Sequence, residues 1–230
     1  MIISRTPFRI SFAGGGTDLR EFYSKEEGQV ISTGIDKYIY VAVKRQTAIS
    51  EYKFRINWSK VEFKDHIEDI EHPIVREAVK IMDMAFPLEI STFADIPSNT
   101  GLGSSSSFAV GLLHALFALK GKMVTKGTLA DMASHLEIDV LGRNIGKQDH
   151  YAAAYGSMNI FTFHADGAVS VVDLFVNTGD ALIEYGGHAA SGGFSVSHES
   201  VHTLHEKFAH AMQGLERSAL SDRQEPDAHM

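Results

Sequence analysis

The residue types and spacing best suited to chemistry lie in a glycine- and serine-rich segment, PSNTGLGSSSSF at residues 97–108. It leads directly into AVGLLHALFALKG, whose apolar residues recur at helical spacing. The first N–H groups of a helix have no partner within it and carry partial positive charge, so the junction predicts a site for the phosphates of a nucleotide. A flexible turn with a serine N-cap is the alternative. The candidate nucleotide-binding residues are Pro97, Ser98, Gly101, Leu102, Gly103, Ser104, Ser105 and Ser106.

Two further segments accompany this one, RTPFRISFAGGGTDLREFY at residues 5–23 and EIDVLGRNIGKQDHYAAAYG at residues 137–156. The three segments, in this order, resemble the GHMP family of small-molecule kinases over residues 1 to about 174. Within that family they look most like heptose 7-phosphate kinases and the related fucose kinases. The resemblance implies ATP and Mg²⁺ as cofactors and transfer of the γ-phosphoryl group to a sugar hydroxyl, the anomeric one of a heptose 7-phosphate. The two common glycine motifs for phosphate, G-x-x-x-x-G-K-[ST] and G-x-G-x-x-G after a strand, are absent from the sequence.

The resemblance implies that Asp149, in KQDHY, is the catalytic aspartate, which accepts or orients the proton of the acceptor hydroxyl. Such a carboxylate sharpens the nucleophile, while alignment and charge stabilisation supply most of the catalysis of phosphoryl transfer. The resemblance also implies that Arg9 is a catalytic cation beside the hydroxyl or the transferring group. Taken alone, Asp149 would more often cap a helix and Arg9 would be an exposed or paired charge.

A metal pair is implied by the same resemblance. Glu137 lies twelve residues before Asp149, where the family places a carboxylate that holds Mg²⁺ together with a loop serine. Ser105 is the predicted partner, with Ser104 and Ser106 as neighbouring alternatives. Hard oxygen ligands of this kind suit Mg²⁺. Glu137 could instead be a solvated carboxylate on a helix.

The predicted acceptor site is the turn GGGTD near the start of the chain. Asp18 matches the aspartate that binds a sugar hydroxyl in galactokinase-like members. Those members carry Glu-His at the two positions that Gly15 and Gly16 occupy in this chain. Two glycines leave space and free N–H groups for a larger or anionic acceptor, which favours a sugar phosphate over galactose. A plain connection between strands is the alternative. The candidate substrate-binding residues are Gly15, Gly16, Thr17 and Asp18.

The elements around these motifs predict an α/β (α+β) fold. Strand patterns cover residues 2–12, 28–45, 54–63 and 88–95, with two more strands between 156 and 174. Helical patterns begin at Pro73, with Ile74, Ala78, Ile81 and Ala85 on one face, follow the glycine-serine segment, and run from Thr125 to Leu141. The resemblance implies a mixed sheet packed against helices, of the ribosomal protein S5 domain 2-like type, with a short α/β tail.

Composition limits the function classes. The chain has 230 residues, a formal net charge of −8 and no cysteine. A broad nucleic-acid surface is normally basic, so this charge argues against one. The absence of cysteine excludes disulfides and thiolate metal sites. The sequence has no apolar run long enough to cross a bilayer, which predicts a cytoplasmic protein without membrane contact.

The sequence after residue 174 departs from the kinase pattern. Residues 181–212 resemble the DHH-associated C-terminal domain of RecJ-like single-strand exonucleases, whose GGH and GGF loop binds the nucleic-acid backbone. This resemblance makes His188 a candidate for nucleic-acid binding. We therefore expect a composite chain: a kinase N-terminal domain (1–174), a partial exonuclease-like segment (175–218) and a disordered tail (219–230). Such a kinase is expected to be weakly active or inactive, and a nucleic-acid-binding fragment is the alternative function.

A zinc-protease motif occurs in the same tail. His198, Glu199 and His202 satisfy H-E-x-x-H. We interpret the match as chance, because the chain has twelve histidines and both motif histidines flank the apolar stripe of the expected helix.

Overall fold

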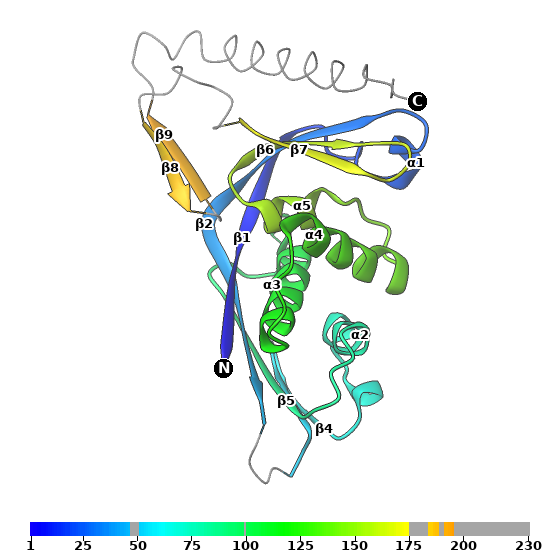
Figure 1. Ribbon diagram of the computed structural model, residues 1–230, viewed down its shortest axis with the longest axis vertical. Helices are drawn as coiled ribbons and strands as arrows, with labels where there is room; N and C mark the ends of the chain where they lie inside the picture. The colour runs from blue at the N-terminus through cyan, green and yellow to red at the C-terminus, as the bar shows by residue number, and fades with distance from the viewer. Residues whose placement is uncertain (47–50, 99, 175–183, 189–190, 196–230) are drawn as a thin grey trace, which may run out of the picture.

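The computed structural model describes residues 1–46, 51–98, 100–174, 184–188 and 191–195 (Figure 1). The strands are β1 (Ile2–Ala13), β2 (Gly28–Arg45), β3 (Phe54–Asn57), β4 (Val61–Lys64), β5 (Leu88–Ala94), β6 (Met158–Phe163), β7 (Val169–Asp173), β8 (Glu184–His188) and β9 (Ser191–Ser195). The helices are α1 (Arg20–Tyr23), α2 (Pro73–Ile81), α3 (Ser104–Leu119), α4 (Lys126–His135) and α5 (Gln148–Tyr155), with a 3₁₀ turn at Ile67–Asp69 and a π-helical turn at Leu136–Val140.

Strand β2 organises a seven-stranded mixed sheet. β1 pairs antiparallel along one edge of β2, while β5 and β6 share its other edge, at residues 39–45 and 28–33 respectively. The remaining pairs are antiparallel except β3 with β5, which is parallel, and the order is β4-β3-β5-β2-β6-β7. Strands β8 and β9 form a separate antiparallel hairpin. The predicted mixed sheet packed against helices is therefore confirmed.

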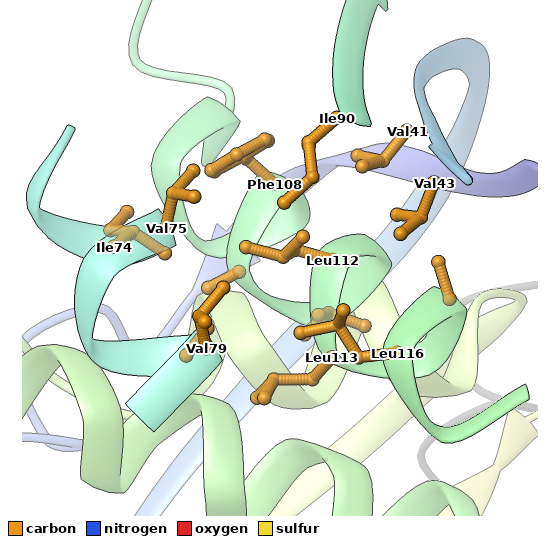
Figure 2. Close-up of a cluster of buried hydrophobic side chains, with 14 of the residues drawn as sticks. Val41, Val43, Ile74, Val75, Val79, Ile90, Phe108, Leu112, Leu113 and Leu116 are labelled. Atoms are coloured by element: carbon orange, nitrogen blue, oxygen red, sulfur yellow. The ribbon is translucent and has the colours of Figure 1, made fainter. Parts of the chain in front are cut away.

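The main core lies between α2, α3 and the sheet. α3 is buried around most of its circumference, as expected for a helix that is apolar on all sides. In Figure 2, Val75 and Val79 of α2 point toward α3, and Phe108 and Leu112 of α3 lie between that helix and Ile90 of the sheet. In Figure 1, the helices lie to one side of the β1–β2–β5 part of the sheet.

Close contact between α3 and β1 fixes where α3 begins. A Cβ on Gly111 would lie 2.6 Å from Thr6 Oγ1, and Ser4 Oγ donates a hydrogen bond to the Gly111 carbonyl at 2.7 Å. Ser107 Oγ donates to the Pro7 carbonyl at 2.8 Å. The first turn of α3 is therefore held beside the middle of β1, next to Arg9.

Three details differ from the sequence predictions. Residues 54–63 form not one strand but the β3–β4 hairpin, because Trp58 and Lys60 make a turn between them. Helix α2 ends at Ile81, which is 40% exposed, and the buried face is Ile74, Val75, Ala78 and Val79. The helix that starts after Thr125 widens into a π-turn before Gly142 rather than continuing as one α-helix.

Other predictions concern parts of the chain that the structure does not describe. Residues 198–202 and the tail 219–230 lie outside the described residues, and so does most of 175–218. His188 falls in β8, where the backbone pairing alone is described. Among the described helices, none has the length and apolarity needed to cross a membrane.

The N-cap of α4 gives a prediction about stability. Thr125 Oγ1 accepts a hydrogen bond from the Thr128 N–H at 3.1 Å. Thr125→Ala is expected to lower the free energy of unfolding by about 1 kcal/mol, because the first turn loses a partner. Thr125→Ser keeps the acceptor and is the matched control. Thermal unfolding should show a drop of about 2 to 4 °C for alanine and little change for serine; equal drops would contradict the capping role.

Candidate active site

A cleft of about 410 Å³ brings the three sequence motifs together. Its residues come from β1, the GGGTD turn and Leu19 after it, the glycine loop and first turn of α3, and the segment from the π-turn to the start of α5. Its lining consists of Arg9, Gly16, Asp18, Leu19, Gly101, Gly103, Ser104, Ser105, Ser106, Glu137, Arg143, Ile145, Gly146, Gln148 and Asp149. Segments more than a hundred residues apart in the sequence thus form one site.

Arg9 and Asp149 form a bidentate ion pair in this cleft. Arg9 Nε donates to Asp149 Oδ1 at 2.6 Å, and Arg9 Nη2 donates to Oδ2 at 2.7 Å. The side chains are 13% and 23% exposed, so the pair is largely shielded but open on the cleft side. A charge-assisted fork of this kind fixes the orientation of the carboxylate. Each carboxylate oxygen keeps a second lone pair for another donor.

The glycine loop wraps around that ion pair. Arg9 Nη1 donates to the Gly101 carbonyl at 2.9 Å, and the Arg9 N–H donates to the Leu102 carbonyl at 3.2 Å. Gly103 is the N-cap of α3, with φ 75° and ψ 29°, a left-handed conformation that favours glycine. A Cβ there would lie 3.2 Å from Asp149 Oδ2. The loop therefore brings the N-terminus of α3 into contact with Arg9 and Asp149.

A second cluster surrounds Glu137. Its side chain is fully buried, and Ser105 Oγ donates to Glu137 Oε1 at 2.5 Å. His150 Nε2 lies 2.9 Å from Oε2, and Arg143 Nη1 also contacts Oε1. Burial opposes ionisation of this carboxyl, but the hydrogen bonds from His150 and Ser105 and the charge of Arg143 outweigh it, so the pKa of Glu137 lies below its ordinary value.

The donors at Ser105 and Glu137 fit a Mg²⁺ ion. Ser105 Oγ and Glu137 Oε1 lie 2.5 Å apart in the lining of the cleft, beneath the Arg143 side chain. Mg²⁺ in nucleotide sites commonly takes few protein oxygens, the rest coming from phosphates and water. Among the described residues, no cluster of three or more His, Asp or Glu side chains could hold a metal by itself.

Asp18 links the first motif to the third. It is almost completely buried, and its Oδ1 accepts the Gly16 N–H while Oδ2 accepts the Gln148 N–H, both at 3.0 Å. Asp18 thereby caps the start of α5, the helix that carries Asp149. A Cβ on Gly146 would lie 1.8 Å from Asp18 Oδ2, so this close approach requires glycine.

The other predicted residues occupy different places. Gly16 lines the cleft, whereas Gly15 and Thr17 do not, and Thr17 Oγ1 donates to the carbonyls of Gly14 and Gln29. Pro97 and Ser98 are exposed and lie outside the lining.

Sequence reasoning missed Arg143, Gln148 and His150 as parts of the site. All three belong to the motif EIDVLGRNIGKQDHYAAAYG, so the motif itself was a signal for them. Gln148 Oε1 accepts a hydrogen bond from Ser11 Oγ at 2.8 Å, which ties α5 to β1.

Comparison with known proteins adds to this geometry. Residues 73–157 match a family model described as the GHMP kinases N terminal domain. This match supports the assignment of the chain to the GHMP kinase family. The matched range contains the predicted site residues Ser105, Glu137 and Asp149, whereas Arg9 and Asp18 precede it.

The chain is also similar to a curated relative and to two solved structures. The D-glycero-alpha-D-manno-heptose 7-phosphate kinase of Campylobacter jejuni is 30% identical over 182 residues, which are 74% of this chain and 53% of the relative. A crystal structure of a D-glycero-D-manno-heptose 1-phosphate kinase from Bacteroides thetaiotaomicron has a TM-score of 0.67 and 23% identity, covering 75% of this chain and 59% of that one. Streptococcus pneumoniae phosphomevalonate kinase in complex with phosphomevalonate and AMPPNP has a TM-score of 0.60 and 17% identity, covering 76% and 59% respectively.

These similarities establish the α/β fold of GHMP kinases. The chain spans about half the length of the curated relatives it matches. The comparisons give no support to the exonuclease-like resemblance of the tail, so the nucleic-acid role of His188 stays a prediction.

Proposed function

We propose that this chain carries the nucleotide and acceptor sites of a sugar kinase, which transfers the γ-phosphoryl group of ATP to a hydroxyl of a heptose phosphate. The observation that carries the proposal is the shared cleft, in which the Arg9–Asp149 pair contacts the N-terminal loop of α3 and the Ser105–Glu137 pair lies on the same lining. Aligned reactants and fixed charges supply most of the catalysis of phosphoryl transfer.

In this proposal the phosphates of ATP lie on the N–H groups at the start of α3, near Gly103 and the serines. Mg²⁺ held by Ser105 and Glu137 would neutralise phosphate charge. The acceptor oxygen attacks the γ-phosphorus, the bond from that phosphorus to the β-phosphate oxygen breaks, and ADP leaves with the electron pair. Asp149 takes the hydroxyl proton, and Arg9 holds the carboxylate in position.

We propose a heptose 7-phosphate as the acceptor, phosphorylated at its anomeric hydroxyl. The name of the Campylobacter jejuni relative supports the heptose 7-phosphate. Gly16 supports a large acceptor, because it lines the cleft and has open space where a Cβ would lie, although its N–H is already bonded to Asp18. Incubation with Mg·ATP and either heptose 7-phosphate or galactose tests the choice, with the product identified by ³¹P NMR. A new anomeric phosphate from heptose 7-phosphate supports the proposal. Transfer to galactose alone, or to neither sugar, would overturn it.

Replacing Glu137 with glutamine is expected to raise the Mg²⁺ concentration needed for ATP binding by about tenfold, because the metal loses its charged protein ligand. Calorimetric titration of ATP at several Mg²⁺ concentrations measures the change. Glu89→Gln removes a carboxylate that pairs with Lys44 and Arg55 on the sheet, and it is the charge-matched control. An unchanged Mg²⁺ requirement in Glu137→Gln would remove Glu137 from the metal site.

A further inference from the structure

Arg143 reaches Glu137 because the chain reverses after the π-turn. Gly142 has φ 64°, in the left-handed region, and the Arg143 N–H donates to the Glu137 carbonyl at 3.1 Å. The reversal places the Arg143 side chain over the carboxylate six residues earlier, which a continuous α-helix would not do.

The guanidinium binds the same two oxygens that are proposed as metal ligands. Arg143 Nη1 donates to Ser105 Oγ at 2.6 Å and to Glu137 Oε1. His150 engages the other carboxylate oxygen from the buried side, so Oε1 is the oxygen left toward the cleft. Arg143 thus supplies the positive charge that this buried carboxylate needs when no metal is present.

A divalent cation bound to Ser105 and Glu137 would compete with this guanidinium for one position. They would repel each other at close range, and both need the lone pairs of Ser105 Oγ and Glu137 Oε1. Arg143 has room to leave, because it lines the cleft and is 34% exposed. Within the described part of the chain, its Nε and Nη2 have no hydrogen-bond partner. An arginine with free donors at this position suits phosphate oxygens.

We propose that Arg143 holds the oxygens of Ser105 and Glu137 in the metal-free protein and moves to the nucleotide phosphates when a divalent cation binds. Arg143 is thereby a positioning residue for the metal pair and a phosphate ligand in the loaded site. This inference rests on the proposed function, in which Ser105 and Glu137 hold Mg²⁺.

Arg143→Gln tests the exchange, because the two halves of the proposal predict opposite effects. Without nucleotide, Mn²⁺ binding followed by electron paramagnetic resonance should tighten about fivefold or more, since the competing charge is gone. Calorimetry with Mg·ATP should show affinity about tenfold weaker, because a charge-assisted phosphate contact is lost. A side chain with a purely structural role would weaken both. Tighter Mn²⁺ binding with unchanged ATP affinity would overturn the move to phosphate, and unchanged Mn²⁺ binding would overturn the competition.

Two further variants serve as controls for the Arg143→Gln experiment. Arg143→Lys keeps the charge in the cluster and is expected to bind Mn²⁺ within about twofold of the wild type, which separates charge from loss of folding. Arg20→Gln removes a largely exposed arginine outside this cleft and should change neither affinity. If Glu137→Gln leaves the Mg²⁺ requirement unchanged, the proposed metal pair fails first, and that result is distinct from a failure of the Arg143 exchange.

Discussion

Asp149→Asn is expected to lower the rate of phosphoryl transfer by about 10² to 10⁴-fold while ATP affinity stays within about twofold. The amide has nearly the shape of the carboxylate and still accepts a hydrogen bond from Arg9, but it cannot take a proton from the acceptor hydroxyl. The loss should therefore appear in kcat rather than in nucleotide binding. Coupled detection of ADP together with ATP calorimetry measures both quantities on the same preparation.

The matched control for this experiment is Asp166→Asn. Asp166 accepts the Ala168 N–H in the exposed turn between β6 and β7, and asparagine can keep that bond. This variant should retain wild-type turnover. Turnover by Asp149→Asn near the wild-type rate would show that the proton of the acceptor goes elsewhere, and Asp149 would then be a partner of Arg9 without a chemical role.

Most of the sheet and the site motifs were predictable because their signals are local. β1, β2 and β5 show strand-like alternation or β-rich composition, and the glycine loop before α3 carries its own signature. The structure brings Arg9, Ser105, Glu137 and Asp149 into one cleft as the motifs imply. The sequence does not predict which charged side chains form ion pairs, because the partners can lie up to 140 residues apart, as Arg9 and Asp149 do.

The missed features have specific physical causes. The exposure of Ile81 follows from where α2 ends against the core, because Val75 and Val79, not Ile81, are buried there. The contact between Arg143 and Glu137 was not predictable from the sequence, because it needs a π-turn and a left-handed glycine, and apolar periodicity indicates neither. His150 lies beside the predicted catalytic aspartate, but its role follows from complete burial against Glu137.

Asp18→Ala is expected to lower the free energy of unfolding by about 3 to 5 kcal/mol, which is about 10 °C in melting temperature. The reason is that two backbone N–H groups, those of Gly16 and Gln148, lose a charged acceptor in a nearly fully buried position. A lost hydrogen bond to a charged group costs about 1.5 to 3 kcal/mol, and here two are lost together. Asp18→Asn retains one acceptor oxygen and should cost about half as much.

Gly146→Ala tests the same contact from the opposite side. It keeps the carboxylate but places a Cβ 1.8 Å from Asp18 Oδ2, so Asp18 must leave the Gln148 N–H. We expect a loss of stability about half that of Asp18→Ala, because the Gly16 N–H can keep its acceptor, and little further loss when Gly146→Ala is added to Asp18→Ala, because the bond to the Gln148 N–H is already gone. Additive losses would contradict this account. If Asp18→Asn instead melts like the wild type while the KM for the sugar rises, the carboxylate acts on the acceptor and not on the start of α5.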